Sequence, residues 1–258
     1  MRTRPLAALS LVVLLVSAGC AGLGPGGAEP TAEELRDRAL KQMASVDSYR
    51  FDATTTAETV EATFRSEVDG TVNRTTRRAV FDATTQVDAG EATNEQVLDM
   101  YVDDRTVYVS LAGEDRWRSI DAGELPATAT FGGADPSWEN DRIERQRALL
   151  ENASVEAVGD ETVDGRQTTV IETTPANGST ATALESTSTG GSLPAGAAIE
   201  SVELTQWVTD EGYVLRSETR AVITIQGQTV DVTTRTEFDD LEGPVRPERP
   251  EGIGNDPS

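Results

Sequence analysis

The chain has 258 residues, with 22 basic against 45 acidic side chains, a single cysteine, no histidine and a formal net charge of −23. So acidic a chain lacks the basic clusters that bind a nucleic-acid backbone, and it is not attracted to anionic lipid headgroups. Without histidine, most metal sites and the Ser-His-Asp and Cys-His forms of catalysis are excluded. We therefore predict a protein that is not an enzyme, carries no metal or cofactor and binds no nucleic acid.

The acidity itself has two interpretations. Acidic chains with few aromatic residues are often disordered, and aromatic residues make up only 5% of this sequence. The acidic residues, however, alternate with Val, Ile, Leu and Thr instead of forming long blocks. We therefore expect a folded protein adapted to high salt, where a Debye length of about 3 Å weakens repulsion between surface carboxylates. Its acidic surface, with Lys41 as the only lysine, resembles those of extreme halophiles.

The first 19 residues have the pattern of a signal peptide. Arg2 and Arg4 precede the apolar segment Leu6–Ala18, which is shorter than the roughly 20 residues of a membrane-spanning helix. The segment Val16–Cys20 resembles a lipobox, in which Cys20 receives a lipid and becomes the new N-terminus. We predict an exported protein anchored by Cys20 to the outer face of the cell membrane. An ordinary signal peptide containing a cysteine is the alternative, and the choice between Sec and twin-arginine export stays open.

A folded domain is expected to begin after a flexible tether over residues 20–30, which is rich in Gly. Thr31 and Glu34 form a capping-box pattern, and an apolar stripe with helical spacing follows it. The stripe consists of Leu35, Ala39, Met43 and Val46. This pattern predicts a helix of about four turns.

Two-residue alternation then replaces the helical period. Tyr49, Phe51 and Ala53 alternate with polar residues, which is typical of a half-buried strand. Further strands are predicted at 62–68, 79–83, 98–102, 105–111 and 114–120, with turns at Asp69-Gly70 and Asp103-Asp104.

The second half of the domain begins with a predicted helix over residues 138–151. A hairpin of strands 155–158 and 166–174 turns at Asp164-Gly165, and a Ser/Thr/Gly/Ala-rich excursion occupies residues 175–198. Three strands follow, over residues 202–208, 213–225 and 228–238, before a loose acidic tail over residues 242–258. The order predicts an α+β fold over residues 31–241, in which a curved antiparallel sheet forms a half-barrel and helices cover its concave face.

Three segments resemble the LolA-like group that includes the LppX and LprG lipoproteins. A lipobox, tether and helix lead into Ser48–Phe51, the segment Val158–Arg166 resembles the group's "G-x-E-x-V-D-G" hairpin, and Trp207–Tyr213 resembles its "W-hydrophobic-x-D-x-G" turn. The resemblance spans most of residues 31–241. It implies a half-barrel whose concave face holds acyl chains, and a protein without catalytic residues that carries lipids or lipoproteins between membrane surfaces.

The candidate site residues follow from these patterns. A hydrophobic groove would be lined by Phe51, Phe64, Phe81, Val109 and Ile223, although ordinary core packing explains the same alternation. N-glycosylation sequons begin at Asn73, Asn152 and Asn177.

Two functions remain in competition at this point. The first is a surface lipoprotein that binds or shuttles a hydrophobic ligand, with lipid as the expected class. The alternative is a structural or interaction lipoprotein with a filled core, accessory to an envelope complex. The sequence names neither the ligand nor a protein partner.

Overall fold

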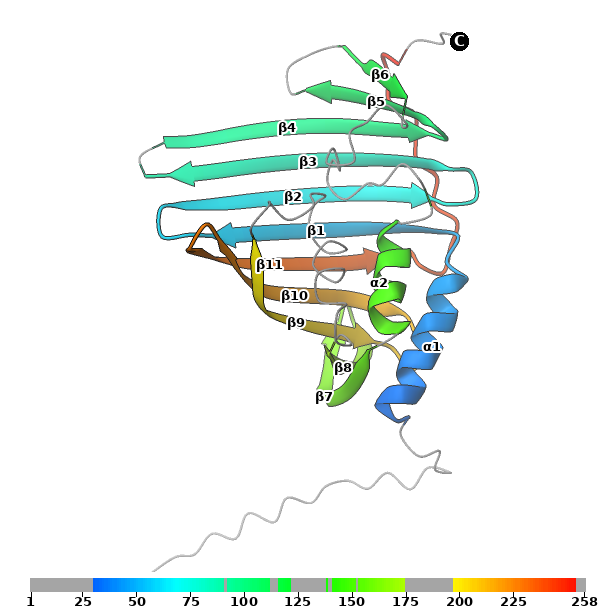
Figure 1. Ribbon diagram of the computed structural model, residues 1–258. Coiled ribbons are helices and arrows are strands. Elements are labelled where there is room, and N and C mark those ends of the chain that lie inside the picture. The colour runs from blue at the N-terminus through cyan, green and yellow to red at the C-terminus, as the bar shows by residue number, and fades with distance from the viewer. Residues whose placement is uncertain are drawn as a thin grey trace, which may run out of the picture.

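The computed structural model describes residues 30–90, 92–111, 116–121, 138, 141–151, 153–174 and 197–253. Within these residues the chain forms one open antiparallel sheet of eleven strands, and two helices lie together at one end of it (Figure 1). The helices are α1 (Ala32–Ala44) and α2 (Arg142–Glu151). The strands are β1 (Ser48–Glu58), β2 (Ala62–Asn73), β3 (Arg78–Ala89), β4 (Ala92–Asp103), β5 (Thr106–Leu111), β6 (Arg118–Asp121), β7 (Ser154–Val163), β8 (Arg166–Thr174), β9 (Ala198–Val208), β10 (Val214–Ile225) and β11 (Gln228–Asp239).

The strands lie in the order β6-β5-β4-β3-β2-β1-β11-β10-β9-β8-β7. Almost every neighbouring pair is consecutive in the chain, as antiparallel hairpins favour. The exception is the central pair β1–β11, which aligns Phe51 with Phe238 and so joins the two halves of the chain. The single antiparallel sheet is confirmed, and the fold is mostly β because the two helices are short.

The first helix forms as its capping residues predict. The Glu34 amide donates to Thr31 Oγ1 at 3.2 Å, and the Thr31 amide donates to Glu34 Oε2 at 3.0 Å. The helix buries Leu35, Ala39 and Met43, which are the first three residues of the predicted stripe. Helix α1 therefore packs against the core through its apolar stripe.

The turn after β9 fixes the position of α1. Gly212 has a φ of 97°, and a Cβ atom there would lie 2.6 Å from the carbonyl carbon of Arg38. Only glycine allows this close approach of the turn to the helix. Arg38 adds a hydrogen bond from Nη1 to the carbonyl oxygen of Asp210 at 2.9 Å. The Trp207–Tyr213 turn thus docks α1 against the sheet.

The segment after β11 differs from the loose tail that the sequence predicts. Val245 and Ile253 are buried, and the Ser48 hydroxyl accepts a hydrogen bond from the Val245 amide at 3.0 Å. Arg249 lies over the ring of Tyr108 at 5.6 Å. Prolines prevent this segment from adding a strand, but its apolar side chains still pack against the ends of the strands.

Several strand boundaries also differ from the predicted ones. Asp69 and Gly70, predicted as a turn, lie inside the continuous strand β2. Strand β4 begins at Ala92 and not at residue 98, and β9 begins at Ala198 and not at residue 202. Both added stretches are polar or exposed, so their alternation is weak. Helix α2 begins at Arg142 because Asp141 caps it, its carboxylate accepting a hydrogen bond from the Glu144 amide at 2.9 Å. The 175–196 part of the predicted excursion lies outside the described residues.

Candidate functional site: the helix-bearing face of the sheet

One face of the sheet carries the side chains that pack with α1 and α2, and we call it the helix-bearing face. The strand registers divide this face into three bands that run across the strands. The aromatic band lies beside the helices and contains Tyr49, Phe51, Phe81, Met100 and Phe238. The hydroxyl band follows and contains Thr55, Ser66, Ser217, Thr219, Thr234 and Thr236. The tip band lies toward the opposite end of the strands and contains Ala57, Phe64, Val87, Ala221, Ile223 and Val232.

The aromatic band is a closed core. The rings of Phe51 and Phe81 lie 6.0 Å apart, and the rings of Tyr49 and Phe238 are also 6.0 Å apart with a T-shaped arrangement. Gly70 lies on the strand between Phe51 and Phe81 and leaves room for both rings. Burial raises the pKa of Tyr49 well above its ordinary range, and Asp141 adds to this effect. The side chains of the aromatic band therefore pack against one another.

The hydroxyl band is polar and buried, an uncommon combination for the inner face of a sheet. All six of its Ser and Thr residues are at most 5% exposed. The hydroxyls of Thr55 and Thr234 hydrogen-bond each other at 3.1 Å. Gln206, which is fully buried and pairs with Ser217 of the band, donates from Nε2 to Gln146 Oε1 of α2 at 3.0 Å. The band supplies polar groups to the interior of the molecule.

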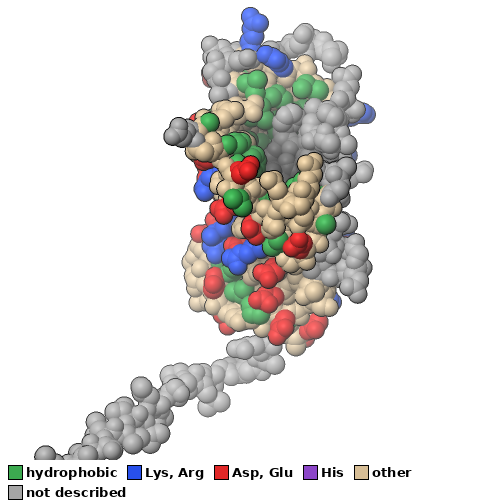
Figure 2. Space-filling view, turned by 60° about the vertical axis from the view of Figure 1, so that its left-hand side comes forward, with side chains coloured by type: hydrophobic (Ala, Val, Ile, Leu, Met, Phe, Trp, Pro, Cys, Tyr) green, Lys and Arg blue, Asp and Glu red, His purple; other side chains and the backbone are tan. Residues whose placement is uncertain are grey.

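The tip band is apolar and only partly covered. Phe64, Ala57 and Val232 are half-buried, and Val87 is exposed. Figure 2 shows the molecule from the end where the β1–β2 and β10–β11 turns lie, and hydrophobic side chains border a hollow there. An apolar concavity that remains partly open is the kind of surface that binds hydrophobic ligands.

Helix α2 places two arginines over the hydroxyl band. Arg142 and Arg145 are 8% and 5% exposed, and the Arg142 guanidinium lies 4.3 Å from the centre of the Phe51 ring. Together with Gln146 they line a small cavity whose other walls are Ser217, Thr219, Thr234, Thr236 and Phe238. The cavity has room for about one water molecule.

An ion-pair network holds the start of α2 in place. Arg74, in the turn between β2 and β3, contacts Asp141 at 2.8 Å and Glu144 at 2.6 Å, and it donates to the Val46 carbonyl oxygen at 3.0 Å. Burial raises the pKa of Asp141, while the charge of Arg74 opposes that shift. Arg74 thus connects the sheet, α1 and α2.

The predicted groove residues divide between these bands. Phe51 and Phe81 belong to the closed aromatic core, and Val109 packs against it. Phe64 and Ile223 belong to the tip band, where Ile223 is buried in a cluster with Ala221. The sequence interpretation missed the hydroxyl band and the arginines of α2. The available signal was Ser or Thr at alternate strand positions, together with Arg142 and Arg145 one helical turn apart.

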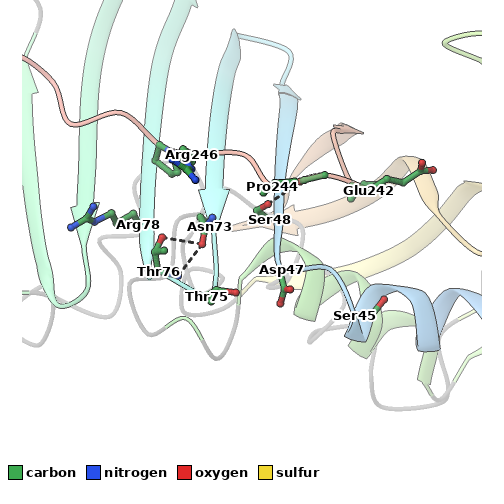
Figure 3. A pocket seen from close by; sticks show the side chains of 13 residues that line it. Ser45, Asp47, Ser48, Asn73, Thr75, Thr76, Arg78, Glu242, Pro244 and Arg246 are labelled. Atoms are coloured by element: carbon green, nitrogen blue, oxygen red, sulfur yellow. Dashed lines mark hydrogen bonds between the residues drawn. The ribbon is translucent and has the colours of Figure 1, made fainter.

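Asn73 and a second hollow lie at the helix end of the sheet. A groove of about 680 Å³ is lined by the start of β1, the β2–β3 turn and the C-terminal segment, and Figure 3 shows the polar side chains around it. Asn73 donates from Nδ2 to the Val245 carbonyl oxygen at 2.8 Å, and its Oδ1 accepts from the Thr76 amide at 2.8 Å. A glycan at Asn73 would be attached to Nδ2. In the folded chain this atom is hydrogen-bonded to the C-terminal segment instead. Asn152, Asn177 and Cys20 lie outside the described residues.

Two general features of the described residues complete the site. None of their helices is long and apolar enough to cross a membrane. None of their Asp, Glu or Cys side chains form a group of three or more suited to hold a metal ion.

The fold resembles that of LprF, and two further solved structures superimpose less well. LprF from Mycobacterium bovis superimposes with a TM-score of 0.53 at 16% identity, over 87% of this chain and 99% of that chain. The lipoprotein LppX from Mycobacterium tuberculosis gives a TM-score of 0.43 at 17% identity, over 82% and 95%. A LolA superfamily protein from Nitrosomonas europaea gives 0.27 at 10% identity, over 85% and 96%.

No protein-family model matches the sequence, and no curated protein matches it. The expected LolA-like, LppX/LprG-like resemblance is confirmed at the level of the fold by the superposition on LprF.

Proposed function

We propose that this protein is an exported, lipid-anchored lipoprotein that binds a hydrophobic ligand without catalysis. The observation that carries the proposal is the partly open tip band, which leaves apolar side chains beside a hollow on a sheet with the fold of LprF (Figure 2). The two helices reach only one end of the helix-bearing face, so a ligand can cover apolar surface that they leave open. Lipid remains the expected ligand class.

The ligand is tested by native mass spectrometry of the purified full chain, followed by two matched variants. Phe64→Asp changes a half-buried tip-band residue, so this variant should fold and lose co-purified lipid. Phe81→Asp places a charge in the closed aromatic core, where Phe81 is 5% exposed, and should unfold the chain. An absence of lipid from the wild type, together with unfolding of both variants, would instead support a filled core.

The alternative function, a structural or interaction lipoprotein, is favoured by the closed half of the same face. The aromatic and hydroxyl bands are filled by their own side chains and those of α2. A protein of this kind would retain its envelope partner when Phe64 becomes Asp. The two functions therefore differ in how the tip band responds to this single change.

Anchoring is tested separately through Cys20. Cys20→Ala removes the thiol that a lipid would modify, and we expect this variant to leave the membrane fraction while keeping its circular dichroism spectrum. The measurement is cell fractionation after a high-salt wash. A variant that remains with the membranes would contradict lipid anchoring at this residue.

A further inference from the structure

The C-terminal segment carries a short sequence repeat. Residues 246–248 and 249–251 both read Arg-Pro-Glu, and together with Pro244 they place a proline at every third position. A polyproline II helix has three residues per turn, so prolines at this spacing fall on one side of it. In both repeats the proline is half-buried, whereas the arginine and the glutamate are exposed. Residues 243–253, which we call the strap, therefore turn their proline side toward the rest of the chain.

The strap crosses the sheet from its centre to one edge. It leaves β11, passes the ends of β1 to β4 and reaches β5 and β6 (Figure 1). Ser48 Oγ donates to the Gly243 carbonyl oxygen at 3.1 Å and accepts from the Val245 amide at 3.0 Å. Asn73 Nδ2 donates to the Val245 carbonyl oxygen at 2.8 Å. These three hydrogen bonds hold the first residues of the strap, and the two repeats lie beyond them.

The repeats lead to aromatic rings on the outer face of the sheet. Tyr101 of β4 and Tyr108 of β5 are paired in the strand register, and their rings lie 6.0 Å apart. Both point away from the helix-bearing face, because their chain neighbours Val102 and Val107 belong to the core. Tyr101 is nevertheless only 1% exposed. The outer face is therefore covered at this point.

The strap contacts this aromatic surface at two points. The Cζ atom of Arg249 lies 5.6 Å from the centre of the Tyr108 ring. Gly252 lies beside Trp117, and a Cβ atom there would be 3.6 Å from the Cδ1 atom of the indole. We call Tyr101, Tyr108 and Trp117 the ring platform. An aromatic surface that holds an extended, proline-rich segment is a recurrent form of peptide recognition.

The contact between the strap and the ring platform can open while the sheet stays folded. The four charged side chains of the repeats are exposed, so they keep most of their water whether the strap is docked or not. The two prolines of the repeats have no backbone N–H to donate. Beyond the repeats, Ile253 is buried to 8% exposure. A terminal segment with so few buried groups opens at a lower free energy than the core.

We propose that the ring platform is a docking surface for the Arg-Pro-Glu strap, and that the strap of a second copy of this chain docks there when the resident strap is displaced. A second copy fits because every copy carries this strap at its chain end, and an exchanged strap makes the same contacts as the resident one. The resident strap competes at an effective concentration in the millimolar range, because a short hinge joins it to β11. This surface lies outside the helix-bearing face, so the inference does not depend on a hydrophobic ligand.

The first test uses the full-length Cys20→Ala chain and a fluorescein-labelled peptide with the sequence of residues 243–253. The strap variant Arg249→Glu/Ile253→Asp frees the platform without changing it. Fluorescence anisotropy should show that the peptide binds this variant about ten-fold more tightly than the parent chain, whose own strap competes. Adding Tyr108→Ala to the strap variant should abolish binding. A control peptide with alanine at both repeat prolines should bind about ten-fold more weakly, because it is less pre-organised.

The second test addresses the second copy directly. The platform variant Tyr108→Ala keeps its strap but lacks a complete platform, and the strap variant has the opposite defect. Each variant alone should be monomeric in native mass spectrometry, and an equimolar mixture should form a one-to-one complex. The parent chain is the control partner for the platform variant. Its occupied platform should bind about ten-fold more weakly than that of the strap variant.

The outcomes separate the parts of the proposal. A folded strap variant that binds no peptide would overturn the docking surface, and equal binding of the two peptides would overturn recognition of the prolines. Peptide binding without a complex in the mixture would contradict the second copy as the partner. If the strap variant does not fold, hydrogen exchange of the parent chain gives the answer. An excess of unlabelled peptide should speed exchange of the strap's own amides, and unchanged exchange would show that the strap is not displaced.

Discussion

Two rows of side chains cross strands β1 to β4 at the same level, one on each face of the sheet. The inner row consists of Phe51, Gly70, Phe81 and Met100. The outer row consists of Asp52, Asp69, Asp82 and Asp99. Each residue of one row is the chain neighbour of a residue of the other. The same register that assembles an aromatic core on one face therefore places four carboxylates side by side on the other.

On the two faces, side chains of the same kind that lie next to one another have opposite effects on stability. Apolar groups that meet on the inner face exclude water and stabilise the fold. Carboxylates that meet on the outer face repel one another. The pKa of Asp52 rises to about 6, because its carboxyl shares a hydrogen bond with Asp69 and is partly desolvated. Burial, followed by the charge of Asp99, also raises the pKa of Asp82. Repulsion within the outer row destabilises the fold, and burial of the inner row offsets this loss of stability.

The largest expected effect comes from the inner row. In Gly70→Ala the new methyl group would overlap the Phe51 ring and lie 2.9 Å from Cδ1 of Phe81. We expect a loss of about 3 kcal/mol in the free energy of unfolding, because the rings cannot both stay in place. Chemical denaturation measures this loss.

Gly159→Ala is the matched control for that variant. Gly159 lies in β7, and a Cβ there would meet nothing within 4 Å. We expect its free energy of unfolding to stay within about 0.5 kcal/mol of the wild type. Equal losses in both variants would show that the Phe51–Phe81 contact does not depend on Gly70.

A smaller effect is expected from screening the outer face. Raising sodium chloride from tens of millimolar to molar shortens the Debye length to about 3 Å and weakens carboxylate repulsion over the whole surface. The melting temperature should rise by roughly 2 to 4 °C for each kcal/mol of repulsion removed. Melts across a salt series measure this. A constant melting temperature would contradict the adaptation to high salt that the net charge of −23 suggests.

The smallest effect isolates one pair in the outer row. The folded-state pKa of Asp52, about 6, lies above its ordinary value of 3.8. The folded state therefore holds the shared proton more tightly, and stability rises as the pH falls from about 7 through 6 toward 4. In Asp69→Asn this rise should shrink. Stability at pH 7.5 should increase by at most about 1 kcal/mol, because solvent screens the pair.

Glu67→Gln is the control for the charge change in Asp69→Asn. Glu67 lies on the same face of β2 as Asp69, and it accepts a hydrogen bond from Arg65 Nε at 3.0 Å. Its removal changes the net charge by the same amount without touching the row of aspartates. Urea unfolding of both variants at pH 7.5 and pH 5 gives the comparison. An identical pH dependence of the free energy of unfolding in both variants would contradict a proton shared by Asp52 and Asp69.

Local sequence patterns predicted helices and strands correctly where capping residues, turn residues or a clear alternation mark them. The capping box at Thr31 and Glu34, the hairpin turn at Asp164-Gly165 and the three C-terminal strands are all present in the structure. The polar start of β4 was missed, because alternation carries no signal where neither face of a strand is buried. The packing of Val245 was missed for a related reason, since a proline-rich segment has no period that reveals a buried residue.

The sequence by itself determined the composition of each strand face, the order of the elements and the antiparallel character of the sheet. It could do so because alternation, capping and turn residues act between near neighbours in the chain. Only the tertiary structure decided that β1 pairs with β11, that four aspartates line up across β1 to β4, and that Arg142 and Arg145 lie over buried hydroxyls. These relations join segments far apart in the chain, and they depend on register and helix docking, which no local pattern encodes.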